Sequence, residues 1–178
     1  MVLATGATPY RPSFEGHDEA HLVDAWQVIK GEVNIGTSVV IADWRCDWIG
    51  LGLAEKLARD GCRVRLCVNG NFAGETIPQY VRDTWLGTLH QLQVEIVPMV
   101  RLFGADSDSA YFEHATSTQP VVCDEMDTLV LALGHTPNIA LEESLTDYTG
   151  DVVAVGDCLA PRTVEEAVLE GLKEAIAI

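Results

Sequence analysis

The chain has 178 residues, a length that predicts one ordinary domain or slightly more. Its 27 acidic and 11 basic side chains give a net charge of −16, which argues against nucleic acid or anionic membrane as a partner because both bind basic surfaces. Apolar residues make up 48% of the chain, enough to fill a core, yet the apolar runs are far shorter than the roughly 20 residues that cross a bilayer. No membrane association is therefore expected.

The cysteine pattern indicates a reducing compartment. The number of cysteines is odd, and no two have the spacing of a zinc or iron–sulfur ligand set. We therefore expect free thiols in a cytoplasmic protein, and no metal ligands. The cysteines are Cys46, Cys62, Cys67, Cys123 and Cys158.

In chain order, the first predicted elements are a strand, an extended segment and a short helix. Residues 1–6 form an apolar run that ends at a glycine, and the proline-rich residues 7–16 favour an extended chain. A strand at the very start of the chain suggests a piece of a longer protein. Asp24 to Lys30 can form a helix that ends at Gly31.

A βαβ unit follows. Residues 38–42 are a continuous apolar run, which is typical of a strand buried on both faces, and residues 63–68 form the second strand. Between them, apolar residues recur at helical spacing up to Gly61. A further amphipathic helix is predicted around residues 81–89, preceded by a capping-box pattern at residues 76–79.

The remaining elements are shorter, except for the last. Residues 94–122 read as short strands joined by turns, which predicts an antiparallel meander. Residues 127–133 and 152–155 are further apolar strands. A long helix follows the capping-box pattern of residues 163–166. Its predicted buried stripe comprises Val164, Ala167, Val168, Gly171, Leu172, Ala175 and Ile176.

One segment of the sequence is repeated. Residues 2–9 and 130–137 are identical at six of eight positions, and each is a strand that leads into a glycine turn and an extended proline segment. Two repeats of this strand–turn–extended pattern predict two linked domains of similar design.

Three short motifs carry a family resemblance. They are Ala4-Thr5-Gly6, the segment from Leu133 to Asn138, and Val155-Gly156-Asp157. Together they resemble flavoproteins that contain two dinucleotide-binding domains. More narrowly, residues 156–171 resemble the C-terminal end of the NADH:flavin oxidoreductases related to trimethylamine dehydrogenase, 2,4-dienoyl-CoA reductase and histamine dehydrogenase.

The resemblance implies an α/β fold. Its main part would be a Rossmann-like, three-layer NAD(P)-type domain with a small antiparallel meander, over residues 34–138. Residues 1–33 would be a returning piece of an FAD/ADP-type domain plus a linker helix, and residues 139–178 the C-terminal piece of that incomplete domain.

The resemblance also implies a parent protein. Members of this family carry FMN and a [4Fe–4S] cluster in an N-terminal TIM barrel, which is followed by a first nucleotide half-domain. Neither is encoded in these 178 residues, so the chain is expected to be a C-terminal piece that is inactive alone and carries no bound cofactor. The parent would be an amine dehydrogenase, an N-demethylase or an NADH:flavin oxidoreductase, with FAD or ADP held in part by this region and with an electron-transfer partner.

The resemblance assigns Thr5, Gly6, Gly156 and Asp157 to cofactor binding, with Asp157 accepting a hydrogen bond from a ribose or ribityl hydroxyl. No residue pattern supports a catalytic group. Two alternatives remain open: an NAD(P)H-binding domain of an enoyl or disulfide reductase, and a docking or scaffold domain without a cofactor.

The turn at residues 42–50 departs from a working dinucleotide fingerprint. Gly50 matches its third glycine, but the first two glycine positions fall on Arg45 and Asp47. We expect Asp47 to cap the following helix, with Trp44 and Trp48 filling the space that glycines leave open. The alternative is that Arg45 binds a phosphate in a reshaped loop.

Overall fold

The computed structural model describes residues 1–177 and divides them into two compact units. The larger unit comprises Arg11–Leu133, and the smaller unit combines Met1–Tyr10 with the chain from Gly134 onward. Residues 11–33 thus pack with the larger unit, because they supply an edge strand and a helix to its sheet. From the sequence, these residues were expected to belong to the first piece of the other domain. No helix in residues 1–177 is both long and apolar enough to cross a membrane.

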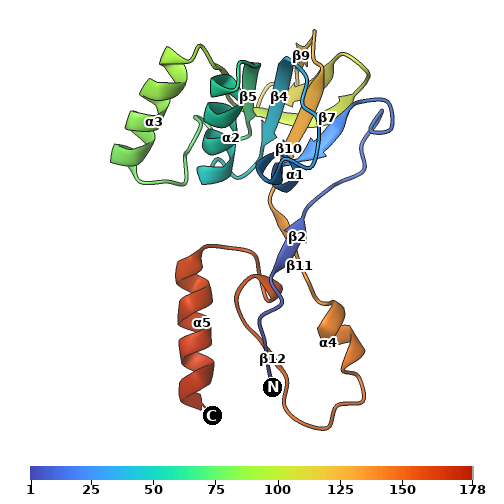
Figure 1. Ribbon diagram of the computed structural model, residues 1–178, viewed down its shortest axis with the longest axis vertical. Helices are drawn as coiled ribbons and strands as arrows, with labels where there is room; N and C mark the ends of the chain where they lie inside the picture. Colours follow the sequence, from blue (N-terminus) through green and yellow to red (C-terminus); the bar gives the residue numbers. More distant parts are fainter. Residues whose placement is uncertain (178) are drawn as a thin grey trace. The chain divides into compact units, whose positions relative to one another are not determined.

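The larger unit is built on a parallel sheet of five strands (Figure 1). The predicted strands at residues 38–42, 63–68 and 127–133 are all present in it, paired in parallel as their apolar runs indicate. In spatial order the strands are β3 (Leu22–Asp24), β10 (Thr128–Ala132), β4 (Ser38–Asp43), β5 (Arg63–Val68) and β6 (Glu95–Val97).

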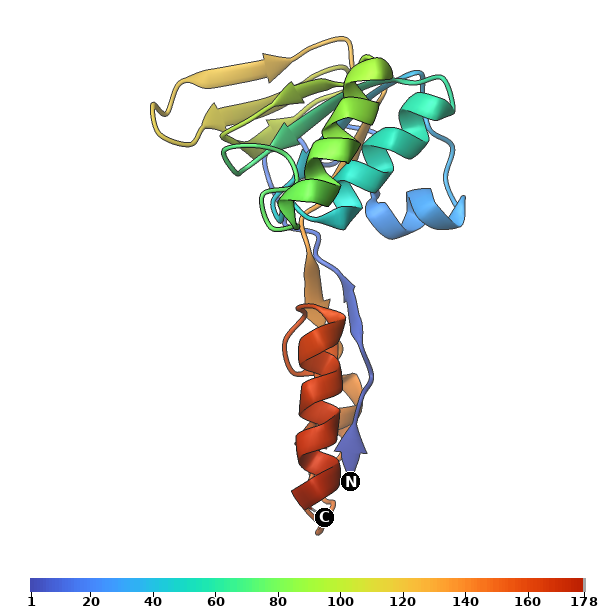
Figure 2. The ribbon, with the colours of Figure 1, turned by 90° about the vertical axis from the view of Figure 1, so that its left-hand side faces the viewer.

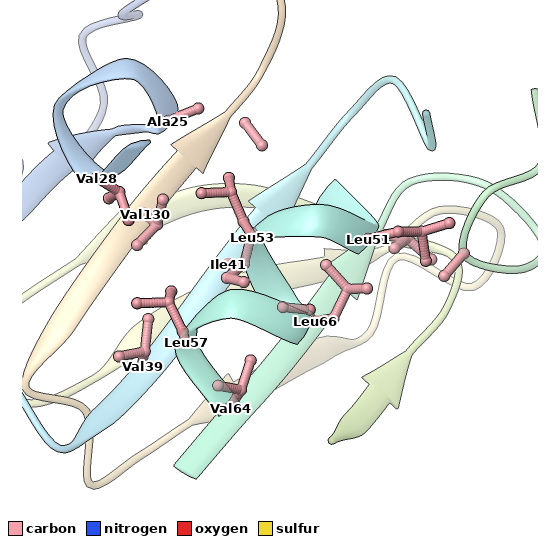
Figure 3. Packing of buried hydrophobic residues seen from close by; sticks show 14 of the residues in the cluster. Ala25, Val28, Val39, Ile41, Leu51, Leu53, Leu57, Val64, Leu66 and Val130 are labelled. Atoms are coloured by element: carbon pink, nitrogen blue, oxygen red, sulfur yellow. The ribbon is translucent and has the colours of Figure 1, made fainter. Parts of the chain in front are cut away.

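Three helices cover one face of this sheet: α1 (Ala25–Lys30), α2 (Trp48–Arg59) and α3 (Gln79–Gln91). Side chains alternate along β4, so that Val39 and Ile41 pack against Leu53 and Leu57 of α2 (Figure 3). The predicted end of α1 is confirmed, since Gly31 caps it with a φ of 69°.

The antiparallel meander covers the other face, as the alternate β4 residues Val40 and Ala42 join its apolar cluster (Figure 2). Its strands are β7 (Val100–Ala105), β8 (Ala110–His114) and β9 (Pro120–Cys123). The predicted three-layer α/β fold with a small antiparallel meander is therefore confirmed.

The capping box predicted at Thr76 is wrong. Helix α3 begins at Gln79 behind Pro78 and has no side-chain cap, and the Thr76 hydroxyl instead donates a hydrogen bond to the Cys46 carbonyl at 3.0 Å. Proline suits the start of a helix because its missing N–H would be unpaired there in any case.

The smaller unit contains two short ladders and two helices. Strand β1 (Val2–Leu3) pairs in parallel with β12 (Val153–Ala154), and β2 (Ala7–Pro9) pairs antiparallel with β11 (His135–Pro137). The extended ends of the two sequence repeats thus pair with each other. The remaining elements are α4 (Ala140–Ser144), the 3₁₀ segment η1 (Gly156–Cys158) and α5 (Val164–Ala177).

Most of the stripe predicted to be buried on α5 is exposed, although Ala167 and Gly171 are half-buried. Val164, Val168 and Leu172 are 75%, 65% and 55% exposed, and no described residue of α5 is buried. The helix and its apolar periodicity were predicted correctly, but periodicity does not specify what covers the stripe. Within its own unit, α5 meets few elements that could bury it.

Candidate nucleotide site

A pocket of about 360 Å³ opens in the smaller unit where two strands end. The parallel pairing of β1 and β12 places the ends of both strands at the same edge, and the Val155 N–H donates to the Leu3 carbonyl at 2.9 Å. The turns that follow these strands contribute Gly6, Gly156 and Asp157 to the pocket wall. Three of the four residues predicted for cofactor binding are thus brought together.

The fourth predicted residue, Thr5, does not line the pocket. Its hydroxyl donates to the Asn138 carbonyl at 2.6 Å, and the Asn138 side-chain amide donates to the Thr5 carbonyl at 3.4 Å. Thr5 therefore links the turn after β1 to the segment that follows β11 by hydrogen bonds.

Both pocket glycines have backbone conformations that other residues rarely adopt. Gly6 has a φ of 74° and Gly156 a φ of 67°. A Cβ at Gly156 would also come within 3.3 Å of Ala167, whereas one at Gly6 would meet nothing within 4 Å. Gly6 is required by backbone conformation alone, and Gly156 also by the close approach of α5.

Arg162 lines the pocket and belongs to an ion pair that sequence reasoning missed. Glu170 of α5 accepts a hydrogen bond from the Gly156 N–H at 2.8 Å and forms an ion pair with Arg162. The Arg162 N–H in turn donates to Asp157 Oδ1 at 3.3 Å. Arg162 lies within residues 156–171, the segment that carries the family resemblance. The role of Glu170 depends on the packing of α5 against η1, which no local sequence pattern predicts.

The N-terminus of α5 is capped by a side chain of the helix itself. Glu166 accepts hydrogen bonds from both the N–H and the hydroxyl of Thr163, as one half of the predicted capping box requires. These hydrogen bonds lower the pKa of the Glu166 carboxyl. The N–H groups of Gly156 and Thr163 thus both bind carboxylates of the chain itself.

In the larger unit, the turn after β4 has the helix cap that the sequence predicted. Asp47 caps α2 by accepting a hydrogen bond from the Ile49 N–H at 2.9 Å, which confirms the expected cap. Its other oxygen holds Arg45 Nε at 2.9 Å, so the side chain considered as a phosphate ligand is engaged by Asp47.

The prediction that tryptophans fill this turn is wrong. Trp44 and Trp48 are 37% and 51% exposed, and Trp48 lies against Trp85 of α3 with ring centroids 6.0 Å apart. The turn is filled by Cys46, which is 3% exposed and accepts a hydrogen bond from the Gly70 N–H through its sulfur at 3.3 Å.

Asp43, at the end of β4, is a buried carboxyl that sequence reasoning did not single out. Its Oδ1 accepts hydrogen bonds from the N–H groups of Arg45 and Cys46, whereas Oδ2 has no hydrogen-bond partner in the described part of the chain. Asp43 is 1% exposed, and this burial raises its pKa to about 7. The sequence pattern that could have identified it is an acidic residue directly after an apolar strand.

No cluster of three or more His, Cys, Asp or Glu side chains suited to a metal ion occurs among residues 1–177.

Comparison with known proteins finds no matching family model, but it does find related oxidoreductases. Bilirubin reductase of Mediterraneibacter gnavus is 29% identical over 89% of this chain, and N,N-dimethylglycine/sarcosine dehydrogenase of Chromohalobacter salexigens is 24% identical over 97%. The chain spans only 24% and 30% of the lengths of these relatives.

Solved structures of the same fold cover nearly all of the chain. A 2-naphthoyl-CoA reductase complex matches 99% of it with a TM-score of 0.84 and 24% identity, and histamine dehydrogenase from Rhizobium sp. 4-9 matches 98% with a TM-score of 0.85 and 17% identity. This chain spans 26% and 30% of those chains. In its motifs, its fold and these similarities, the chain resembles the C-terminal part of the NADH:flavin oxidoreductases of the trimethylamine dehydrogenase, 2,4-dienoyl-CoA reductase and histamine dehydrogenase group.

Proposed function

We propose that this chain is the C-terminal nucleotide-binding part of a larger flavin- and iron–sulfur-dependent oxidoreductase, of the amine dehydrogenase, N-demethylase or NADH:flavin oxidoreductase type. The smaller unit would help to hold FAD or ADP and so support electron transfer elsewhere in the parent. One observation carries the proposal: Gly6, Gly156 and Asp157 meet at one pocket of about 360 Å³. That volume lies within the range of about 300–1,000 Å³ typical of small-ligand sites.

The residues of this pocket suit the sugar of a nucleotide better than its phosphates. The Asp157 carboxylate can accept hydrogen bonds from ribose or ribityl hydroxyls, since the bond that it accepts from the Arg162 N–H is long at 3.3 Å. A pyrophosphate needs N–H donors, but those of Gly156 and Thr163 bind Glu170 and Glu166. We therefore assign the pyrophosphate to the glycine-rich turn of a preceding half-domain.

The larger unit would have a structural role in this assembly. Its fold is that of a nucleotide-binding domain, but the turn where a pyrophosphate would bind holds the Asp47 carboxylate at the helix N-terminus. This carboxylate disfavours the alternative in which the unit binds NAD(P)H.

Sequencing upstream of Met1 and analysing the intact gene product test the proposal. We expect an upstream reading frame that encodes a barrel and a cysteine cluster, and about one adenine nucleotide released per heat-denatured protein. An upstream redox cysteine pair would favour the reductase alternative instead. An intact protein that contains no adenine nucleotide would contradict nucleotide binding.

A further inference from the structure

Two cysteines from different sheets of the larger unit meet in its core. Cys67 lies on β5 of the parallel sheet and Cys123 at the end of β9 in the meander, 56 residues apart in sequence. Their sulfur atoms are 3.6 Å apart, and the two residues are 1% and 2% exposed. Because a disulfide places its sulfurs about 2.05 Å apart, a relative shift of roughly 1.5 Å would join them.

The environments of the two thiols differ. The hydrogen bond between the two thiols and the nearby Arg65 guanidinium lower the pKa of Cys123, while the same hydrogen bond and burial raise the pKa of Cys67. Arg65 is held beside the pair by Glu95 at 3.4 Å and Asp124 at 3.5 Å. Since the thiolate is the reactive form, Cys123 is the thiol placed to react first and Cys67 the one placed to follow.

The other three cysteines lack such a neighbour. Cys62 donates to the Gly36 carbonyl, Cys46 accepts from the Gly70 N–H, and Cys158 donates to backbone carbonyls of its own unit. Burial raises the pKa of Cys46 to about 11, so its thiol is less reactive than that of Cys123.

We propose that Cys67 and Cys123 form a reversible disulfide when the protein meets a peroxide, joining the parallel sheet to the meander. The Cys123 thiolate attacks one peroxide oxygen, which gives a sulfenic acid and, after protonation, one water. The Cys67 sulfur then attacks the Cys123 sulfur, the sulfur–oxygen bond breaks, and the hydroxyl leaves as a second water with the Cys67 proton. Two electrons pass from the two thiols to the peroxide, and a thiol reductant reverses the change.

The test treats the 178-residue chain with hydrogen peroxide, alkylates the remaining thiols under denaturing conditions and maps the peptides by mass spectrometry. We expect one cross-linked peptide pair, Cys67 with Cys123, that is lost after dithiothreitol. A map in which both thiols stay reduced while Cys62 is oxidised would overturn the proposal, and so would one in which either thiol pairs elsewhere. The wild-type map decides this without any variant.

Variants assign the order of the two steps. In Cys67→Ser, the Cys123 sulfenic acid has no partner thiol, so we expect sulfinic acid at Cys123 under the same treatment. In Cys123→Ser, Cys67 should remain reduced. The control Cys62→Ser, which alters a half-buried thiol away from the pair, should form the Cys67–Cys123 link as the wild type does. Oxidation of Cys67 in Cys123→Ser to the extent seen at Cys123 in Cys67→Ser would overturn the proposed order.

Discussion

Asp43 and Asp157 both follow strands, yet their surroundings give them different roles. Within residues 1–177, Asp43 is buried with one oxygen that has no hydrogen-bond partner, whereas Asp157 lines a pocket and accepts a long hydrogen bond from the Arg162 N–H. A carboxyl without partners in an apolar interior prefers its neutral form, while one at a pocket wall can bind a hydroxyl. A test of Asp43 therefore measures stability, and a test of Asp157 measures ligand affinity.

Asp43→Asn should remove a pH dependence of stability. The pKa of Asp43 rises from 3.8 in the unfolded chain to about 7 in the folded one. Between these values the folded state binds more protons, so the free energy of unfolding falls as pH rises, by up to about 1.4 kcal/mol per pH unit. All four tryptophans lie in the larger unit, so urea unfolding followed by tryptophan fluorescence reports on that unit.

We expect the wild type to lose stability relative to Asp43→Asn from pH 4 to pH 7, and the two curves to run parallel above that. The control is Asp60→Asn, because Asp60 is an exposed carboxyl paired with Lys56. Parallel curves for wild type and Asp43→Asn over the whole range would show that Asp43 does not titrate in this way.

Asp157→Ala should weaken nucleotide binding in the full-length parent. Losing a charge-assisted hydrogen bond costs about 1.5–3 kcal/mol, so affinity for the adenine nucleotide should fall roughly 10- to 150-fold. The melting temperature of the nucleotide-free protein should change little, because the bond to the Arg162 N–H is long. Both quantities are measured on the same variant, by calorimetry and by thermal unfolding.

Asp147→Ala is the matched control, because Asp147 is an exposed carboxyl of the same unit that does not line the pocket. If affinity is unchanged in Asp157→Ala while the nucleotide-free protein melts earlier, Asp157 only holds its turn together.

At the scale of elements, helix α2 illustrates why two nearby glycines are not equivalent. A Cβ on Gly50 would lie 2.1 Å from Asp43 Oδ2, whereas one on Gly52 would come no closer than 3.7 Å to any atom of Trp85. Asp43 cannot easily move away, since its other oxygen is held by two N–H groups. Gly50 thus keeps the packing role of the third fingerprint glycine even though the cofactor turn is absent.

Gly50→Ala should therefore destabilise the larger unit by about 1–3 kcal/mol, the usual cost of overpacking. Gly52→Ala should be neutral or stabilise it by up to about 1 kcal/mol, because alanine is the better helix former. Urea unfolding followed by tryptophan fluorescence measures both variants. Equal effects of the two substitutions would mean that α2 does not pack on Asp43 as closely as described.

The turn that begins α2 should bind nicotinamide cofactors poorly. Asp47 places a carboxylate at the helix N-terminus, where a pyrophosphate would bind, so the dissociation constant of the chain for NADH should be no tighter than about 1 mM. Calorimetry measures it, and micromolar binding would contradict this expectation.

At the scale of the whole molecule, the two units differ in how much core they contain. The larger unit has apolar clusters on both faces of its sheet, whereas the buried apolar residues of the smaller unit are few within residues 1–177: Leu3, Val155 and Cys158. Apolar side chains of α5 remain exposed, and the chain spans only 24% and 30% of the lengths of two of its relatives.

The 178-residue chain should accordingly purify without stoichiometric flavin. Its pocket offers an acceptor for sugar hydroxyls, but the N-terminal donors of η1 and α5 are bound by Glu170 and Glu166. The visible absorption spectrum of the purified chain measures this, with the full-length parent as the positive control. A flavin spectrum at one equivalent per chain would show that the smaller unit binds FAD unaided.

Local sequence patterns predicted the elements of the larger unit and several of their ends. Apolar runs predicted the strands β4, β5 and β10, and Gly31 and Asp47 marked a helix end and a helix start. These features are predictable because strand burial and helix capping depend on residues close together in the chain. The motif residues Gly6, Gly156 and Asp157 were also named from the sequence, and the structure places them at one pocket.

Contacts between side chains of different elements could not be predicted from the sequence. The contact of Cys67 with Cys123, the approach of Glu170 to Gly156 and the burial of Asp43 beneath Gly50 join residues from different elements. The exposure of the α5 stripe belongs to the same class, because periodicity shows that a face is apolar but not what lies opposite it. Such contacts depend on how helices and strands pack in three dimensions, which local patterns in the sequence do not specify.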